Sequence, residues 1–441
     1  MAASVFDSPL YAHLFPTGEA GRLFSDTAAI RAMLLVEGAL AHAQGAQGVI
    51  PELSAKAIQR ATMEIQIDPG AIASATGENG VSVPGLIAAF RAEMNAPEHA
   101  QFVHWGATSQ DIIDTGLMLR LRQLLLLAEA DLRTIIASLA TQAKAHSTTP
   151  MAARTYGQQA TPTSWGAVIA DWGHALCDLT DALPALRKTS LLVSLSGAAG
   201  TSSALGVDAA QTRAALAKGL GLNDPMRSWH VDRGPILRIA DWLVQVTSVL
   251  SRMGGTLIAL TGSEIGEVTL GAAGASSTMP QKQNPVGPSA LQALGHQMTG
   301  LRTALAPATQ HLHQRDGAAW FTEWMVLPQI ALGTACALQH AKTLSSSMVP
   351  NAGKMAATLE GGLGLIHAEA LSFALTAQVQ RPKAQALAKA LCHQAQDEGA
   401  ELEDIARAAY PDLPDELFDP VKSLGLAPQE AMAFVARAKA L

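Results

Sequence analysis

The sequence predicts an all-α protein that is built on a bundle of long helices. Between Asp111 and His146 there is no proline and one glycine, and Leu and Ile recur every three or four residues, which is typical of one helix face. At 1.5 Å per residue, this segment is a helix about 54 Å long. Similar patterns cover 235–261, 288–305 and 327–348, and each begins near a proline, a common residue in a first helical turn.

The rest of the chain extends this helical pattern. Ser25 and Asp26 can cap a helix that runs to about Gly48, and another helical pattern starts at Pro162. Strand signals are sparse, and the best candidate, 191–195, is only five residues long. Few strands among long helices indicate an elongated helical bundle.

A change of composition near Val349 divides the chain. From there to Leu441 the helices look shorter and more charged, which suggests a small C-terminal domain. We expect three domains, namely an N-terminal helical domain at 1–107, a central helical-bundle domain at 108–348 and the C-terminal domain at 349–441. A chain of 441 residues is longer than one core usually holds.

The composition indicates which partners to expect. Hydrophobic residues make up 49% of the chain and charged residues only 15%, so we expect further surface to be buried in an oligomer. The net charge is −7 and there is no basic stripe, which argues against nucleic acid as a partner. Any anionic substrate must therefore be met by local cations.

Cysteines and apolar segments point to an intracellular protein. Cys177, Cys336 and Cys392 are odd in number and form no CxxC pair, so neither a disulfide framework nor a thiolate zinc site is expected. The first residues lack the pattern of a signal peptide, and the most apolar stretches carry charges. We therefore expect no segment that spans a membrane, no membrane partner and a cytoplasmic location.

Three polar loops interrupt the helical pattern, and loops on rigid scaffolds often carry the chemistry. The first, 104–111, places the hydroxyls of Thr108 and Ser109 at the start of the long helix, where backbone N–H groups favour an anion. An ordinary helix cap is the alternative at this position. The second loop, 154–162, brings the cation of Arg154 together with hydroxyl and amide groups just before the next helical pattern.

The third loop, 274–285, combines serines with a lysine and an asparagine. A serine acts as a base only when nearby donors or a cation stabilise its alkoxide. Lys282 follows Ser276 by six residues and could supply a fixed positive charge for a developing oxyanion. A flexible surface loop is the alternative, and the apolar flanking helices argue against it.

This third loop resembles the SSxMPxKxN signature of the fumarase/aspartase superfamily. The matching residues are Ser276, Ser277, Met279, Pro280, Lys282 and Asn284. The other two loops follow in the order of the superfamily's TSxD and GRTHxQ regions. The resemblance implies a three-domain fold with a central bundle of long helices, a homotetramer whose active sites are shared between subunits, and no metal or other cofactor.

The resemblance also implies roles for individual residues. Ser276 corresponds to the catalytic base, and Lys282 and Asn284 would stabilise an aci-carboxylate intermediate. Thr108 and Ser109 would hold a substrate carboxylate. Further substrate-binding candidates in the matching loops are His104, Arg154, Thr155, Tyr156, Gln158, Ser277 and Met279.

Two departures from the superfamily pattern occur together. Tyr156 stands where lyases of the superfamily usually have the histidine of GRTH, and Ser289 stands where they have a glutamate that polarises this histidine. Expelling a hydroxide or an amine needs a proton at the leaving atom. A carboxylate needs none, because the pKa of its conjugate acid is about 4. The absence of both residues favours a reaction in which the C–O bond that is made or broken belongs to a carboxylate, such as a lactonisation.

One branch of the superfamily, the bacterial 3-carboxy-cis,cis-muconate cycloisomerases, carries out such a lactonisation. The segments 104–111, 228–233 and 320–324 resemble its HWGATSQD, PWHTxR and WHAEW motifs. The implied reaction forms 4-carboxymuconolactone in the β-ketoadipate pathway of aromatic catabolism. Tyr156 in place of Trp, and Gly157-Gln158-Gln159 in place of Leu-Gln-His, are departures that could shift specificity toward another substituted muconate.

A tricarboxylate substrate needs several cations. Arg154, Arg233, Arg315 and Lys282 lie in or near the motif loops, and an arginine can bind a carboxylate through two hydrogen bonds. Each could equally be a structural ion pair, and we favour Arg315 and Lys282.

Other functions remain open at this level. A lyase of the same superfamily that releases fumarate, similar to adenylosuccinate lyase or an ammonia lyase, is the main alternative. A non-catalytic protein like the lens crystallins of the superfamily is another. His311-Leu312-His313 lacks further ligands for a metal site, and the glycines from Gly197 to Gly206 fit a tight bend better than a dinucleotide loop.

Overall fold

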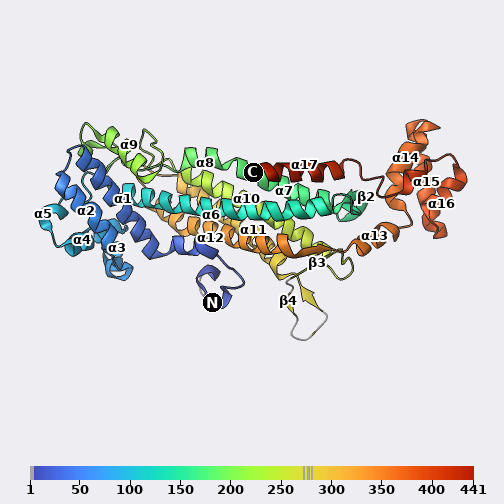
Figure 1. Cartoon of the computed structure of the whole chain (residues 1–441), viewed down its shortest axis with the longest axis horizontal. Helices are drawn as coiled ribbons and strands as arrows, with labels where there is room; N and C mark the ends of the chain where they lie inside the picture. Colours follow the sequence, from blue (N-terminus) through green and yellow to red (C-terminus); the bar gives the residue numbers. More distant parts are fainter. Residues whose placement is uncertain (1–3, 272–273, 276–278, 280–281) are drawn as a thin grey trace. The chain divides into compact units, whose positions relative to one another are not determined.

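The computed structural model describes the chain except residues 1–3, 272–273, 276–278 and 280–281 (Figure 1). The fold is mostly helical, as predicted, and it divides into two compact units. Unit 1 comprises Met1–Ala130, Leu179–Ser248 and Leu294–Gln339, and unit 2 comprises Asp131–Asp178, Val249–Ala293 and His340–Leu441. The three domains expected from the sequence stay a prediction.

Long helices form where the periodicity predicts them. They are α6 (Ser109–Ala145), α7 (Trp165–Asp181), α10 (Gly234–Leu260), α11 (Val286–Leu305) and α12 (Gly317–Ser347). The predicted start of α12 at residue 327 is wrong. The helix begins at Gly317, and Pro328 lies inside it. Asp316 accepts the backbone N–H of Ala319 at 3.1 Å, so the first turn is capped well before the proline.

Shorter helices complete unit 1. They are α1 (Asp26–Ala46), α2 (Glu52–Glu64), α3 (Ala73–Asn79), α4 (Val83–Met94), α5 (Pro97–Ala100), α8 (Leu183–Ser190) and α9 (Ala209–Leu220). The Ser25 side chain accepts the N–H of Ala28 at 3.2 Å, which confirms the predicted cap of α1. Gly45 lets α1 approach α2 closely, since a Cβ there would lie 2.3 Å from that of Ala55.

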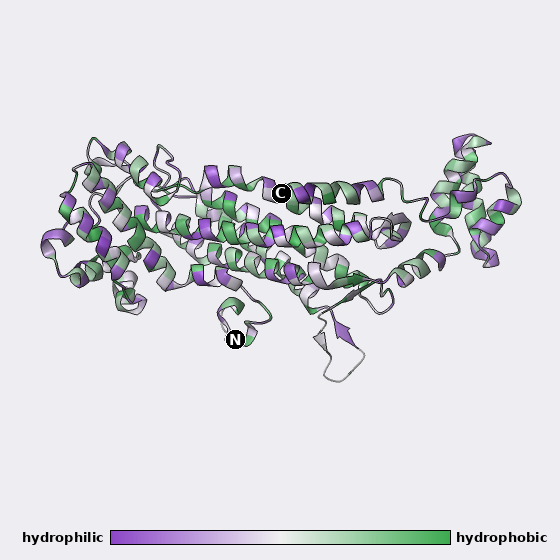
Figure 2. Cartoon of the chain, in the orientation of Figure 1, coloured by the Kyte–Doolittle hydropathy of each residue, from purple (hydrophilic) through white to green (hydrophobic). Residues whose placement is uncertain are grey.

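Hydrophobic and hydrophilic residues alternate along the bundle helices (Figure 2). In α10 the buried residues recur at helical spacing, for example Ile239, Leu243, Val246 and Leu250. Of the residues described, α10 is also the one helix that is long and apolar enough to cross a membrane. The absence of a membrane-spanning segment stays a prediction, because a buried core helix has the same length and composition.

Short two-stranded sheets account for the described strands. The pairs are β1 (Pro150–Thr155) with β2 (Gln158–Ser164), β3 (Val268–Leu270) with β6 (Met348–Pro350), and β4 (Gly274–Ala275) with β5 (Gln283–Asn284), all antiparallel. The sequence missed these pairs and placed the start of a helix at Pro162, which lies in β2. The turn between β1 and β2 has positive φ at Tyr156 and Gly157, a geometry typical of tight hairpins.

The predicted strand at 191–195 is wrong. Only Leu192 forms an isolated bridge there, with Asn223. The segment is extended and buried, and Trp229 donates its indole N–H to the carbonyl of Val193 at 2.8 Å. A single bridge satisfies too few backbone groups to make a sheet, so the β-branched and leucine side chains here serve packing.

The C-terminal helices of unit 2 are α13 (Ala352–Glu360), α14 (Ala368–Ala374), α15 (Arg381–Glu398), α16 (Leu402–Ala409) and α17 (Ala427–Ala440). Helices α14 to α16 share a core that includes Leu371, Leu391 and Leu402. Helix α17 returns to lie along α7 (Figure 1), and Arg437 pairs with Asp178 at 2.7 Å.

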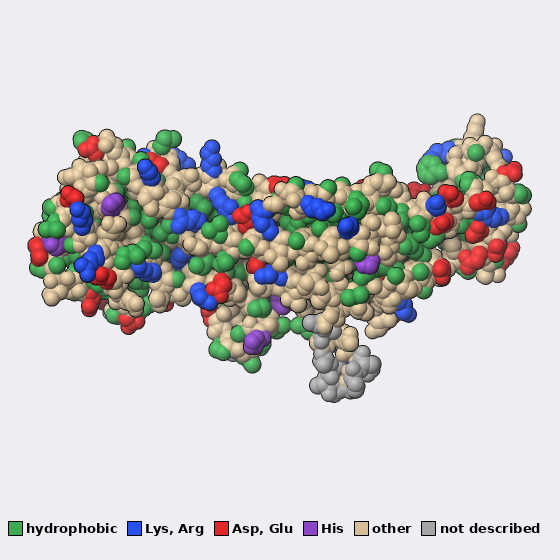
Figure 3. Space-filling model, in the orientation of Figure 1, with side chains coloured by type: hydrophobic (Ala, Val, Ile, Leu, Met, Phe, Trp, Pro, Cys, Tyr) green, Lys and Arg blue, Asp and Glu red, His purple; other side chains and the backbone are tan. Residues whose placement is uncertain are grey.

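Charges are mixed over the surface that Figure 3 shows. Lys and Arg side chains are scattered there among Asp and Glu, and hydrophobic side chains lie between them. Exposed large apolar residues in the described chain include Leu126, Phe321, Met325 and Val349. Apolar side chains on a surface of this kind are available for contacts with other molecules.

The contact between α7 and α17 can be tested by adding one methyl group. A Cβ at Gly173 would lie 2.2 Å from the ring of Phe434, so we expect Gly173→Ala to lower the stability of unit 2 by about 1–3 kcal/mol. Gly300 in α11 has no neighbour within 4 Å of such an atom, so Gly300→Ala is the control and should stabilise by about 0.5–1 kcal/mol. Thermal unfolding measures both. Equal shifts in the two variants would mean that α17 does not pack on α7 as described.

Candidate active site

Asp111 fixes the start of α6, where Thr108 and Ser109 lie. Its carboxylate accepts the backbone N–H of Thr108 at 3.1 Å, while the N–H of Asp111 donates to the carbonyl of Thr108 at 2.9 Å. The contact of the Asp111 carboxylate with the N–H of Thr108 is one half of a capping box, with aspartate in the place of glutamate. Asp111 is fully buried and also accepts hydrogen bonds from Ser194 Oγ, Ser196 N, Gly197 N and His230 Nε2.

A buried ion network lies one turn further along α6. Arg233 donates to Asp114 at 2.7 and 3.0 Å and to Glu323 at 2.8 and 2.9 Å, and all three side chains are at most 1% exposed. Burial and the charge of Asp114 raise the pKa of Glu323, although the neighbouring Arg233 acts in the opposite direction. The guanidinium of Arg233 is thus committed to two carboxylates, and the motifs at 228–233 and 320–324 join in this network.

Gln110 connects the network to Arg315. Its side chain is fully buried and donates to Asp114 at 3.2 Å and to the carbonyl of His230 at 2.9 Å. Its Oε1 accepts Nε of Arg315 at 2.8 Å. Gln110 is not among the site residues predicted from the sequence, although it lies within the first motif loop.

Arg315 lies at the surface end of this chain of hydrogen bonds. It donates to Thr108 Oγ1 at 3.4 Å and to the carbonyl of Ala198 at 3.2 Å. Within the part of the chain that the structure describes, no carboxylate forms an ion pair with it. A partly exposed cation beside the N-terminus of a long helix is suited to bind an anion.

His104 and Glu37 form a pair at the beginning of the same loop. His104 has a positive φ of 63°, and its Nδ1 lies 2.6 Å from Oε1 of Glu37, which is 1% exposed. Burial lowers the pKa of His104, but the hydrogen bond and charge of Glu37 outweigh burial, and the net shift is upward. The ring is therefore held in one orientation with Nδ1 engaged.

The second motif loop lies in unit 2. Arg154 binds Glu267 through two hydrogen bonds of 2.9 and 2.7 Å, and Glu267 is fully buried. This pair neutralises the arginine in the way a structural ion pair does. Tyr156 at the tip of the β1–β2 hairpin is completely exposed, and Thr155 and Gln158 beside it are exposed as well.

The third motif loop, also in unit 2, is bracketed by β4 and β5. Gly274 pairs with Asn284, and the N–H of Lys282 donates to the carbonyl of Met279 at 3.0 Å. Lys282 and Met279 are exposed. Ser276 and Ser277, the serines of the signature, lie outside the described residues.

The predicted site residues thus fall into two groups. Unit 1 brings Thr108 and Arg315 into contact, with Ser109 next in the chain and His104 at the head of the same loop. Unit 2 carries the predicted site residues of the second and third motif loops. In the described part of the chain, no group of three or more His, Cys, Asp and Glu residues is placed to hold a metal ion. His311 accepts the backbone N–H of Asp316 at 3.2 Å, and this hydrogen bond orients its ring within the loop before α12.

Comparison with known proteins agrees with this arrangement. A family model described as lyase matches residues 19–300. A 3-carboxy-cis,cis-muconate cycloisomerase of Pseudomonas aeruginosa is 37% identical over 95% of this chain and 93% of its own length. A nitrosuccinate lyase of Streptomyces davaonensis is 33% identical over 97% and 94%. The crystal structure of 3-carboxy-cis,cis-muconate lactonizing enzyme from Pseudomonas putida has a TM-score of 0.91 at 33% identity and covers 98% of this chain and 99% of that chain.

The His104–Glu37 pair predicts a pH dependence of stability. The pKa of His104 is higher in the folded protein than in the unfolded chain, where it is about 6.5. The protonated ring therefore stabilises the folded state fully below about pH 6.5, and this contribution is lost as the pH rises through the pKa of the folded protein. Glu37→Gln removes the charge that raises the pKa. We therefore expect the unfolding temperature of the wild type to fall more steeply than that of Glu37→Gln as the pH rises above about 6.5. Parallel curves for the two proteins would show that the pair contributes no such linkage.

Proposed function

Since the chain belongs to the lyase family, we propose that it is a 3-carboxy-cis,cis-muconate cycloisomerase that forms 4-carboxymuconolactone. The relatives and the solved structures with this activity cover nearly the whole chain. The observation that carries the proposal is Arg315, a cation without a carboxylate partner among the described residues, held at the start of α6. Such a site suits a substrate whose recognised groups are carboxylates. The proposed pathway is aromatic catabolism through β-ketoadipate.

We assign the binding of one substrate carboxylate to the first loop. Arg315 would donate to the carboxylate together with the hydroxyls of Thr108 and Ser109 and the free N–H groups of the helix start. Gln110 and Thr108 already orient the guanidinium, so little side-chain freedom is lost on binding. His104 stands at the beginning of this loop and would add a donor.

The proposed reaction needs no metal and no other cofactor. One carboxylate of the substrate adds to a conjugated C=C bond, the new C–O bond closes the lactone, and the electron pair moves onto a second carboxyl group as an aci-carboxylate. Lys282 and Asn284 would stabilise this dianion, and the hydroxyl of Ser276 would donate a proton to the adjacent carbon. One proton is taken up overall, because the attacking carboxylate loses its charge in the ester bond. Ser277 and Met279 would line the same loop.

Tyr156 and Ser289 support this chemistry. Together they lack the histidine–glutamate pair that supplies the proton for an amine or hydroxide leaving group in lyases of the superfamily. Tyr156 is fully exposed in the single chain, where Thr155 and Gln158 flank it, and it is free to contact a substrate held by another subunit. The role of Arg154 in substrate binding is the least supported, since Glu267 already neutralises its charge.

We further propose a homotetramer with active sites shared between subunits, three domains at 1–107, 108–348 and 349–441, and a cytoplasmic location. The exposed positions of Tyr156, Met279 and Lys282 support sharing, because a substrate needs more enclosing surface than either hairpin offers by itself. The exposed apolar side chains described above are consistent with subunit contacts. We propose neither a nucleic-acid nor a membrane partner.

A lyase that releases fumarate is the second candidate. The observation that favours this candidate is the similarity to the nitrosuccinate lyase of Streptomyces davaonensis. Adenylosuccinate lyase and ammonia lyase activities are weaker alternatives, because position 156 lacks the histidine. A non-catalytic role is disfavoured by the complete signature loop.

The reaction can be followed by the ultraviolet absorbance of the conjugated diene. We expect the wild type to remove the diene band of 3-carboxy-cis,cis-muconate without added metal or nucleotide, and Ser276→Ala to lose about two to four orders of magnitude in turnover. Ser203→Ala, at an exposed serine outside the motif loops, is the control and should retain activity. Fumarate release from a substituted succinate, with no loss of the diene, would instead support the second candidate.

Gln110 offers a test of the carboxylate site itself. Gln110→Leu removes the acceptor of Arg315 Nε, so we expect KM to rise about tenfold, the equivalent of one charge-assisted hydrogen bond, with a smaller change in kcat. Thr247→Val is the control, because it deletes another buried hydrogen bond of unit 1, between Thr247 and Thr334. An unchanged KM in Gln110→Leu, or an equal rise in both variants, would separate Arg315 from substrate binding.

A further inference from the structure

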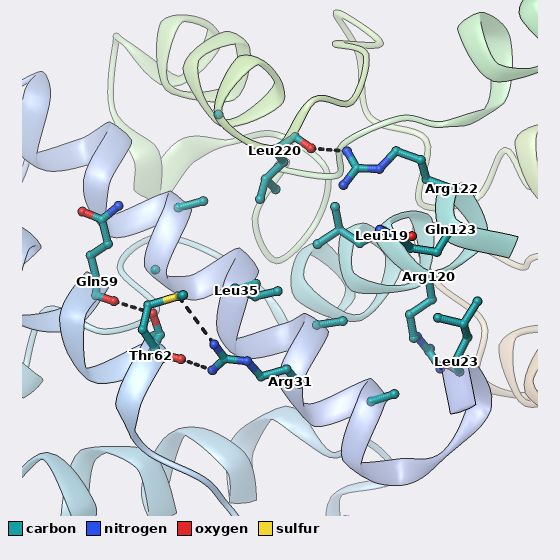
Figure 4. Close-up of a pocket in the computed structure, with 16 residues that line it drawn as sticks. Leu23, Arg31, Leu35, Gln59, Thr62, Leu119, Arg120, Arg122, Gln123 and Leu220 are labelled. Carbon is teal, nitrogen blue, oxygen red and sulfur yellow. Dashed lines mark hydrogen bonds between the residues drawn. The ribbon is translucent and has the colours of Figure 1, made fainter. Parts of the chain in front are cut away.

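A second cationic cavity lies in unit 1, apart from the motif loops. It has a volume of about 450 Å³ and is bounded by α1, α2, α6 and the end of α9 (Figure 4). This volume is within the range of about 300–1,000 Å³ that is usual for small-molecule sites. Three arginines line it, Arg31 from α1 and Arg120 and Arg122 from α6, and no acidic residue is among the lining residues.

The three arginines bind neutral acceptors only. Arg31 donates to the carbonyl of Thr62 and to the sulfur of Met63, Arg120 to the carbonyl of Leu23, and Arg122 to the carbonyls of Leu220 and Gly221. None of the three forms an ion pair with a carboxylate in the part of the chain that the structure describes. Elsewhere in unit 1, by contrast, Arg187, Arg213 and Arg302 each form an ion pair with a carboxylate.

Helix capping explains the positions of two of these arginines but leaves most of their charge in place. Arg31 meets the C-terminal turn of α2 and Arg122 that of α9. A helix C-terminus carries the equivalent of about half a negative charge, which is less than the charge of one guanidinium. The cavity therefore remains positive.

Arg120 is partly buried, as Arg31 and Arg122 are. Its Nε is buried and has no hydrogen-bond partner among the described residues. Burial lowers the pKa of Arg120 to about 10, although Asp26 acts in the opposite direction. A buried donor without a partner costs free energy, and an acceptor on a ligand would offset that cost.

The remaining lining is mostly apolar. Leu23, Leu35, Leu119 and Leu220 contribute side chains around the arginines (Figure 4). Inorganic phosphate would leave this apolar surface without a partner, whereas a carboxylate on a hydrocarbon body matches both parts. The cavity is also remote from the first loop, since Arg120 follows Ser109 by about 16 Å along α6.

We infer that this cavity is a binding site for a small carboxylate with an apolar body, separate from the proposed catalytic residues. Such a ligand would place its carboxylate between Arg31, Arg120 and Arg122 and its hydrocarbon body against the leucines. Because α6 carries both the cavity and the start of the first motif loop, occupancy stabilises a helix on which the proposed active site is built.

Benzoate is a suitable probe, and isothermal titration calorimetry on the full-length protein measures its binding. We expect saturable binding to the wild type and a loss of affinity of at least about tenfold in Arg31→Gln and in Arg122→Gln, the equivalent of one charge-assisted hydrogen bond. Glutamine can keep a hydrogen bond to the backbone carbonyl while it removes the charge. Arg91→Gln is the matched control, because Arg91 also donates to a backbone carbonyl, that of Val103, but does not line the cavity.

Two further ligands and one variant decide between the alternatives. Benzyl alcohol, which has the body without the charge, and inorganic phosphate, which has charge without the body, should each bind much more weakly than benzoate. Lys282→Ala should retain benzoate binding while it loses turnover. Equal affinity in the wild type, Arg31→Gln and Arg122→Gln, or loss of binding in Lys282→Ala alone, would overturn the inference and place benzoate in the proposed active site. Equal binding of phosphate would overturn the assignment of an apolar ligand.

Discussion

The buried triad of Asp114, Arg233 and Glu323 holds together the part of unit 1 on which the candidate site depends. Its members come from α6, from the residue before α10 and from α12, so one guanidinium joins three long helices. Each carboxylate accepts two hydrogen bonds from it. A buried pair of this kind contributes little net stability over an apolar core, but loss of one partner leaves an uncompensated charge and costs about 3–5 kcal/mol. The triad is therefore best understood as a device that fixes the geometry.

From this triad, hydrogen bonds lead outward to a cation that is not neutralised. Asp114 accepts from Gln110, and Gln110 accepts from Arg315. Arg233 has two carboxylates and Arg315 has neutral acceptors only, so two residues of the same type have opposite functions. The first fixes the geometry of the scaffold, while the second keeps a charge that is available for the proposed ligand and is oriented by Gln110. This arrangement is a form of preorganisation, because the orientation of Arg315 is settled before any anion binds.

Much of the fold was predictable because it follows from periodicity and local capping. Helices α1, α6, α10 and α11 begin and end close to where their apolar spacing and caps predict. The β1–β2 hairpin was not predictable in the same way, since it depends on positive φ at Tyr156 and on pairing that offers no periodic signal. Helix α12 was misjudged because Pro328 looks like a helix start unless the cap at Asp316 is known.

The candidate site was predictable as a set of loops but not as a set of roles. Arg154, Arg233 and Arg315 look alike in the sequence, and their functions depend on acceptors that are distant in the chain. Glu267 follows Arg154 by 113 positions, and Glu323 follows Arg233 by 90. Gln110 could not be predicted as a site residue because an amide carries no charge, yet it is the residue that links the network to Arg315. Partner identity is a tertiary property, so residue type alone could not assign it.

The pattern of paired and unpaired cations also bears on turnover. The protein carries a net charge of −7, so a polyanionic substrate is attracted only where arginines and lysines lack carboxylate partners. Lactonisation converts one carboxylate of the substrate into an ester, and the product therefore carries one negative charge fewer. A site built from fixed cations loses one charge-assisted contact when the product forms, whereas the intermediate that precedes it keeps the total charge of the substrate and concentrates two negative charges on one carboxyl group. The same cations that favour the intermediate over the substrate thus bind the product least, which promotes its release.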